Sequence, residues 1–154
     1  MKPTIRTAAA AALLLASPLL AAAPAAAQPR EEAAWKWLDQ AMAPTLNHEQ
    51  RAKLLWAAYN NAAGSLCHEV TVDDAKLGAI LASLLPTAAD NATAEQTRHL
   101  EGSVLVHLGA ATGIFAAENA DNLTEFCAEA VALRDAPDGT SLFLPKEELE
   151  PAKK

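Results

Sequence analysis

The sequence has little of what catalytic and cofactor-binding motifs require. It contains two cysteines and six glycines among 154 residues, and no C-x-x-C, C-x-x-C-H, G-x-S-x-G or H-E-x-x-H motif occurs in it. Thioredoxin-like redox chemistry, covalent haem attachment, hydrolase nucleophile elbows and zinc-protease sites each depend on one of these patterns. We therefore expect a protein that is not an enzyme and that carries no cofactor.

Positive charge is also scarce. Twelve Lys and Arg residues stand against nineteen Asp and Glu residues, and the formal net charge is −7. Nucleic acids and anionic lipid surfaces attract basic faces. The only adjacent basic pair in the second half of the chain is Lys153-Lys154, at the extreme end. We expect an acidic protein with no nucleic-acid partner.

The first 27 residues have the layout of a Sec signal peptide. Lys2 and Arg6 precede an apolar run over residues 8–20, and small residues lead to Ala25-Ala26-Ala27. The apolar run is shorter than the ~20 residues that a bilayer span needs, and no cysteine near the cleavage site could be lipidated. The pattern predicts cleavage after residue 27, one domain over residues 28–154, and no membrane span after cleavage. We expect a bacterial periplasmic or secreted protein that is not a lipoprotein.

The remainder of the chain shows helical rather than strand periodicity. Apolar residues recur at helical spacing, as with Trp35, Leu38 and Met42 before Pro44. Capping-box patterns begin at Asn47, Thr71 and Thr93. The expected helices cover about 31–43, 47–66, 71–86, 94–117 and 121–134. The sequence thus predicts an all-α fold, a small bundle of four to five helices.

The segment 94–117 is predicted to be the buried helix of this bundle. Residues 104–117 carry no Asp, Glu, Lys or Arg, and a helix that is apolar on all sides is usually buried. Gly109, Gly113 and Ala117 recur every four residues, which makes a ridge of small residues. Such a ridge favours the close crossing of another helix inside the bundle.

Cys67 and Cys127 are predicted to form one disulfide. An even number of cysteines in an exported chain usually pairs in an oxidising compartment. The rival interpretation is a nucleophilic Cys67 with His68 as its base, but adjacent helical residues diverge by about 100°. A structural role for the stretch Leu66 to Glu69 is therefore favoured over a reactive one.

Two groups of residues are candidate contacts for another protein. Trp37 lies about 200° around its helix from Trp35 and is expected to be exposed, and exposed Trp residues often anchor protein interfaces. The apolar patch Leu142, Phe143 and Leu144 follows a turn and is expected to pack across the end of the bundle, before a charged tail at about 145–154. We expect the partner to be another envelope or secreted protein.

An alternative function is a metal or small-ligand carrier within the bundle. Glu95 and His99 are four residues apart and could share a helix face, and His107 lies two turns further along. A carboxylate and two imidazoles are donors that zinc or copper accepts. This makes Glu95, His99 and His107 weak candidate ligands.

Two resemblances suggest further forms of protein binding. The small size, predicted export, acidity and single disulfide are similar to those of periplasmic acid-stress chaperones. The succession of Cys67, Val70-Thr71 and the amphipathic stretch Leu77 to Leu84 resembles, over some twenty residues, the secreted immunity proteins of type VI systems. These resemblances imply a chaperone-like or immunity-type protein and assign no role to a particular residue.

Overall fold

The structure is a computed structural model that describes residues 28–86, 90–137 and 139–149. The predicted signal peptide and the last residues of the predicted tail lie outside these residues. The main helices are α1 (Gln28–Met42), α2 (His48–Leu66), α3 (Asp74–Ala82), α4 (Ala94–Asn119) and α5 (Leu123–Arg134), and α6 (Lys146–Leu149) is a single turn. The described residues form no strand apart from one isolated antiparallel bridge between Val72 and Phe143. The predicted all-α bundle is confirmed.

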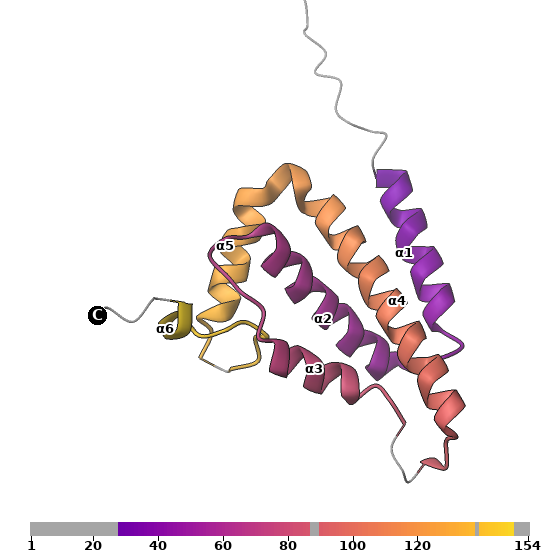
Figure 1. The fold of residues 1–154 in the computed structure, drawn as a ribbon. Coiled ribbons are helices and arrows are strands. Elements are labelled where there is room, and N and C mark those ends of the chain that lie inside the picture. Colours follow the sequence, from indigo (N-terminus) through magenta and orange to yellow (C-terminus); the bar gives the residue numbers. More distant parts are fainter. Residues whose placement is uncertain (1–27, 87–89, 138, 150–154) are drawn as a thin grey trace, which may run out of the picture.

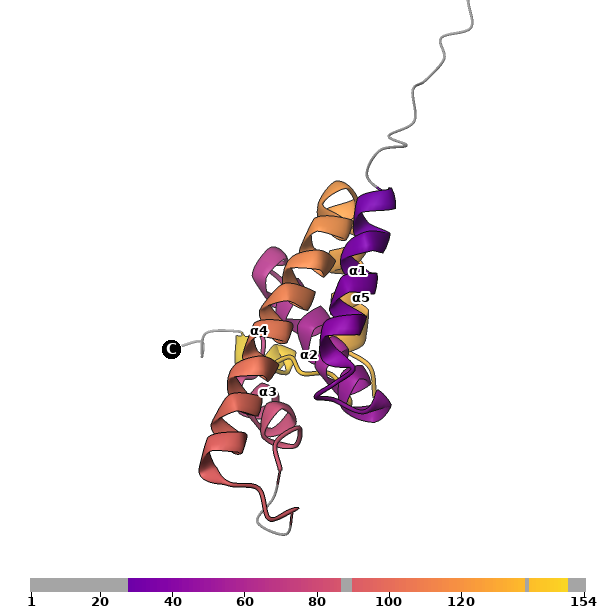
Figure 2. The same cartoon turned by 90° about the vertical axis from the view of Figure 1, so that its right-hand side faces the viewer.

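Helix α4 is the central element of the bundle. It packs against both α1 and α2, and α3 runs along another side of α2 (Figure 1). A 3₁₀ turn over Ala120–Asn122 then reverses the chain so that α5 returns against α2. The side view shows α4 running along most of the length of the described structure (Figure 2).

The predicted start signals act at α2 and α4. The Asn47 side chain accepts a hydrogen bond from the Gln50 backbone N–H, and the Gln50 side chain accepts one from the Asn47 N–H, both at 2.9 Å. Thr93 and Gln96 form the same reciprocal pair. These boxes satisfy N–H groups that lack partners in the first turn of a helix.

The start predicted for α3 at Thr71 is wrong, because Asp73 caps that helix. The Asp73 carboxylate accepts hydrogen bonds from the backbone N–H groups of Ala75 and Lys76. Thr71 lies outside the helix instead, and its carbonyl accepts a hydrogen bond from the Leu144 N–H at 2.8 Å. Pairing with the distant C-terminal segment therefore overrides the local capping pattern.

The core consists of two adjoining clusters of buried side chains. The first joins α1, α2 and α4 and centres on Leu38, Leu54 and Ala111, all 0% exposed. The second surrounds the end of α2 and the start of α5, where the ring of Tyr59 makes edge contacts with Phe115 and Phe126. Since α2 and α4 contribute to the first cluster and α2 and α5 to the second, α2 connects the two.

The expectation that α4 is buried on all sides is wrong for one of its faces. Val104, His107, Leu108 and Ala111 are buried, whereas Leu105 and Val106 are exposed. Because α1 and α2 pack against only one side of α4, its other side stays in solvent. By length and hydropathy the stretch Ala94–Arg134 could also cross a membrane, although the 3₁₀ turn at Ala120–Asn122 breaks it into two antiparallel helices.

Candidate binding sites

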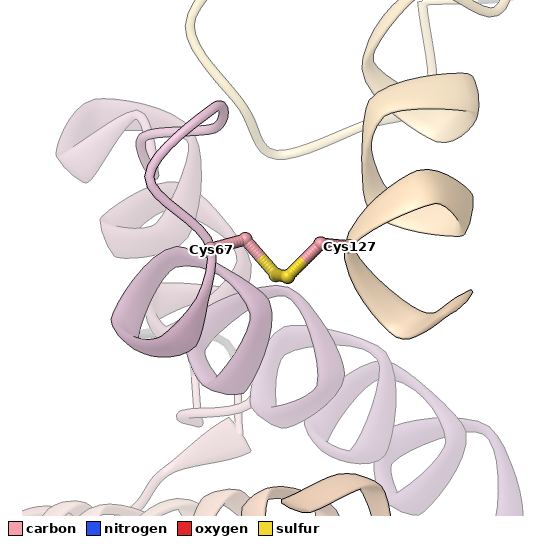
Figure 3. Close-up of a disulfide and its surroundings, with 2 residues drawn as sticks. All are labelled: Cys67 and Cys127. Atoms are coloured by element: carbon pink, nitrogen blue, oxygen red, sulfur yellow. A yellow bond between two sulfur atoms is a disulfide. The ribbon is translucent and has the colours of Figure 1, made fainter. Parts of the chain in front are cut away.

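The predicted disulfide is present and joins the end of α2 to α5. The Sγ atoms of Cys67 and Cys127 are 2.04 Å apart and the Cα atoms 5.4 Å apart, across 60 residues of sequence (Figure 3). Cys67 is the C-cap of α2, and its backbone N–H donates to the Ala63 carbonyl at 2.8 Å. Both thiols are consumed in the bond, so neither can act as a nucleophile while it is intact.

A surface pocket of about 510 Å³ lies beside the disulfide, between the end of α2 and one face of α5. We call it the disulfide pocket. Its walls are mainly apolar, and His68 and Glu69 are exposed where the chain leaves α2. The lining residues are Leu66, Cys67, His68, Glu69, Leu123, Thr124, Cys127, Ala128 and Val131. Its volume lies within the roughly 300 to 1,000 Å³ of small-molecule sites.

The loop that borders this pocket is held by Arg134. Its guanidinium donates to the Glu69 carbonyl oxygen at 2.6 Å and pairs with the Asp135 carboxylate at 2.7 Å. The hydrogen bond to Asp135 raises the pKa of Arg134, and the same bond lowers the pKa of Asp135. The backbone at Glu69 is thus tied to the last turn of α5, and the disulfide is not the only link across the pocket.

Trp37 lies on the outer side of α1, as its spacing predicts, with 57% of its surface exposed. The opposite side of α1 is firmly anchored. Leu38 and Met42 are buried, Trp35 makes an edge contact with Phe115, and its indole N–H donates to the Glu118 carboxylate. Trp37 is therefore presented to solvent on a helix that its neighbours hold in place.

The C-terminal patch is inside the fold, which removes most of it as a partner contact. Leu142 is 4% exposed and Phe143 1%, whereas Leu144 is half-buried. The segment is held because the Leu142 carbonyl accepts a hydrogen bond from the Asp73 N–H at 2.7 Å. The Lys76 ammonium donates to the carbonyls of Ser141 and Phe143. The expected packing across the end of the bundle is found, and the side chains of Leu142 and Phe143 leave no surface for another protein.

The structure does not bring the three candidate metal ligands together. Glu95 and His99 are exposed, whereas His107 is 8% exposed and faces the interior. The nearest side-chain partner of His107 is Ser103, whose Oγ lies 3.4 Å from Nδ1, and burial lowers the pKa of His107. Within residues 28–86, 90–137 and 139–149, no three His, Cys, Asp or Glu side chains converge as a metal site would require.

Two features were not predicted from the sequence. The disulfide pocket arises from the packing of Leu123 and Val131 near Leu66, residues that are distant along the chain. The exposed face of α4 could not be distinguished from a buried one, because its composition is apolar all round. The chain matches no protein-family model, no curated protein and no solved structure.

Proposed function

We propose that this protein is a Sec-exported, non-enzymatic protein of the bacterial periplasm or secreted fraction, and that it binds another envelope or secreted protein. The observation that carries the proposal is the exposure of Trp37 on the anchored helix α1. A large aromatic side chain in solvent is costly, and the side chains that dominate binding energy at protein interfaces are enriched in Trp. The acidic composition favours a protein as the partner over a nucleic acid or another polyanion, which acidic side chains would repel.

Site-specific photocrosslinking in the producing cell tests this proposal. A photoreactive residue at position 37 should yield a discrete adduct with one protein, identified by mass spectrometry. The matched control carries the same residue at Ala132, which is exposed on α5 rather than on α1. An identical adduct pattern from both positions, or no adduct from position 37, would contradict the proposed contact.

The crosslinked species also separates the two forms of protein binding that the sequence resembles. An immunity-type protein should capture one toxin-like partner in stoichiometric amount. A chaperone-like protein should capture many clients, and more of them after brief acid exposure.

Amino-terminal sequencing of the periplasmic protein tests the export step, for which we expect Gln28 as the first residue.

The disulfide pocket supports a second candidate function, the binding of a small apolar ligand. Its volume and mainly apolar walls favour this function, and the site differs from the one expected around His99 and His107. An environment-sensitive apolar dye such as anilinonaphthalene sulfonate is a suitable probe. We expect Ala128→Trp, which fills the pocket, to reduce dye fluorescence, whereas Ala79→Trp on the exposed side of α3 should leave it unchanged. Equal fluorescence from both variants would contradict ligand binding at this pocket.

A further inference from the structure

From Gly102 onward the outward face of α4 is apolar, uncharged and uncovered by any other part of the described chain, and the exposed Glu101 borders it. Leu105 is 53% exposed and Val106 66%, which makes them two of the four most exposed large hydrophobic side chains among the described residues. Gly102, Gly109 and Gly113 lie on the same side of the helix, and a Cβ built on any of them would meet nothing within 4 Å. We call these five residues the α4 face.

The close helix crossing predicted at Gly109 and Gly113 is thus not supplied by the described part of the chain. The buried residues of α4 lie on its other side, toward α1 and α2. A second apolar surface borders the α4 face, because Leu105 also lines a groove of about 210 Å³ between α3 and α4. Exposed apolar surface that is contiguous in this way usually marks an interaction site.

We propose that the α4 face packs against the same face of a second copy of the chain, with the two α4 helices antiparallel and a two-fold axis near Gly109. In an antiparallel pair centred there, Gly109 meets Gly109 of the second copy. Leu105 then lies opposite Gly113, so the large side chain of one copy fills the space left by the glycine of the other. The same face carries both a large side chain and the glycine that makes room for it. The face is therefore complementary to itself, as a two-fold interface requires.

Charge favours the antiparallel orientation over the parallel one. Arg98 lies at one end of the α4 face, and the exposed Asp121 follows its other end. With the axis at Gly109, Arg98 lies opposite Ala120 and therefore beside Asp121 of the second copy. A parallel pair would instead place Arg98 next to Arg98. Such an exposed pair contributes little to affinity, but like charges in the parallel arrangement select against it.

The size of the surface indicates a weak dimer. The α4 face spans residues 102–113, which is about 18 Å of helix, and at a helix diameter of about 10 Å it covers roughly 180 Å². A stable interface commonly needs about 800 Å² from each partner. The second copy would also cover the groove between α3 and α4, because the C-terminal half of its α4 lies opposite Leu105. We therefore expect self-association in the micromolar range rather than an obligate dimer.

Analytical ultracentrifugation of the mature chain tests the association. We expect a concentration-dependent dimer, and we expect Gly109→Leu to remain monomeric because its side chain occupies the two-fold contact. The substitution has room in the single chain, and circular dichroism should show an unchanged helical fold. Ala132→Leu on the exposed side of α5 is the matched control and should dimerise like the parent. A parent chain that is monomeric at all concentrations, or a Gly109→Leu variant that still dimerises, overturns the proposal.

Cysteine crosslinking tests the register. Gly109→Cys should form an inter-chain disulfide, because the two positions meet at the axis. Gly113→Cys should not, since the two copies of residue 113 would lie about 12 Å apart along the helices. A double variant with Leu105→Cys and Gly113→Cys should crosslink again, because residue 105 of one copy lies opposite residue 113 of the other. Equal crosslinking by both single variants overturns the register.

Charge reversal and lipid binding complete the test. Arg98→Glu should weaken the dimer, and adding Asp121→Arg should restore it; a failure of this rescue overturns the antiparallel pairing.

Flotation with phosphatidylcholine vesicles tests a membrane as the occupant of the face. Vesicle binding by a parent chain that shows no dimer would assign the α4 face to lipid and overturn the proposal.

Discussion

Asn60 accepts a hydrogen bond from the backbone N–H of Leu142 at 3.3 Å, across 82 positions of sequence. The Asn60 side chain is fully buried in α2, and its amide group also donates to the Trp56 carbonyl at 2.8 Å. The C-terminal segment is therefore anchored in the core by a polar side chain. This contact explains why an apolar patch after a turn is enclosed rather than presented to a partner.

Replacing Asn60 should destabilise the protein more than replacing its neighbour. Asn60→Ala leaves the Leu142 N–H buried without an acceptor, at a cost of about 1 to 3 kcal/mol in the free energy of unfolding. Asn61→Ala is the control, because Asn61 is only partly buried and contacts Thr112 at 3.3 Å. Urea denaturation followed by circular dichroism measures both. A smaller loss for Asn60→Ala than for Asn61→Ala would contradict the anchoring role.

The disulfide should contribute a large share of the stability. A closed loop of 60 residues corresponds to about 4 kcal/mol in the chain-entropy estimate, against a typical total of roughly 5 to 15 kcal/mol. The double substitution of Cys67 and Cys127 by Ser should lower the melting temperature accordingly.

A direct chemical check accompanies this measurement. Thiol labelling of the unfolded, unreduced mature protein should add no tags, and labelling after reduction should add two. Two tags without reduction would show that the cysteines are not bonded to each other.

Gly64 is expected to be intolerant of a side chain, because a Cβ there would lie 2.5 Å from Cγ2 of Val72. That contact is closer than packed side chains allow, so Gly64→Ala should lower the free energy of unfolding despite the better helix propensity of Ala. Gly78→Ala in α3 is the control. Its Cβ meets nothing within 4 Å, and the substitution should stabilise the helix by roughly 0.5 to 1 kcal/mol. Thermal melting of the two variants should therefore shift in opposite directions.

Burial of His107 should make stability depend on pH near neutrality. Its pKa is lowered from the ordinary value of 6.5 because the folded state disfavours the charged ring. The unfolded chain then takes up a proton at a higher pH than the folded chain does. The free energy of unfolding should fall as the pH drops below about 6.5 and stop falling, for this group, below the folded pKa.

His107→Gln isolates this contribution from that of the carboxylates. The variant should show a smaller decline in the free energy of unfolding between about pH 7.5 and pH 5. Denaturant titrations at a series of pH values measure the difference between the two proteins. Parallel curves would show that His107 does not titrate differently on folding.

Residues that act within one helix were predictable. The capping boxes at Asn47 and Thr93, the inward stripe through Trp35, Leu38 and Met42, and the outward position of Trp37 all follow from spacing. Each depends on interactions within one or two turns, where helix geometry fixes the neighbours. Pairing of the cysteines was predictable for a different reason, because a chain with only two leaves one intramolecular partner.

Contacts between distant segments decided the rest. Thr71 matches a capping residue locally, yet its carbonyl pairs with the Leu144 N–H and Asp73 caps the helix instead. Burial beside Asn60 removed Leu142 and Phe143 from the surface. The exposure of the α4 face and the disulfide pocket likewise depend on which neighbours are absent at each side of a helix. By itself the sequence determined the main helices, the N-terminal caps of α2 and α4 and the sulfur pair, since these depend on local geometry and on count. Which apolar side of α4 meets solvent was decided by the tertiary structure alone, because apolar composition is the same for a buried face and an uncovered one.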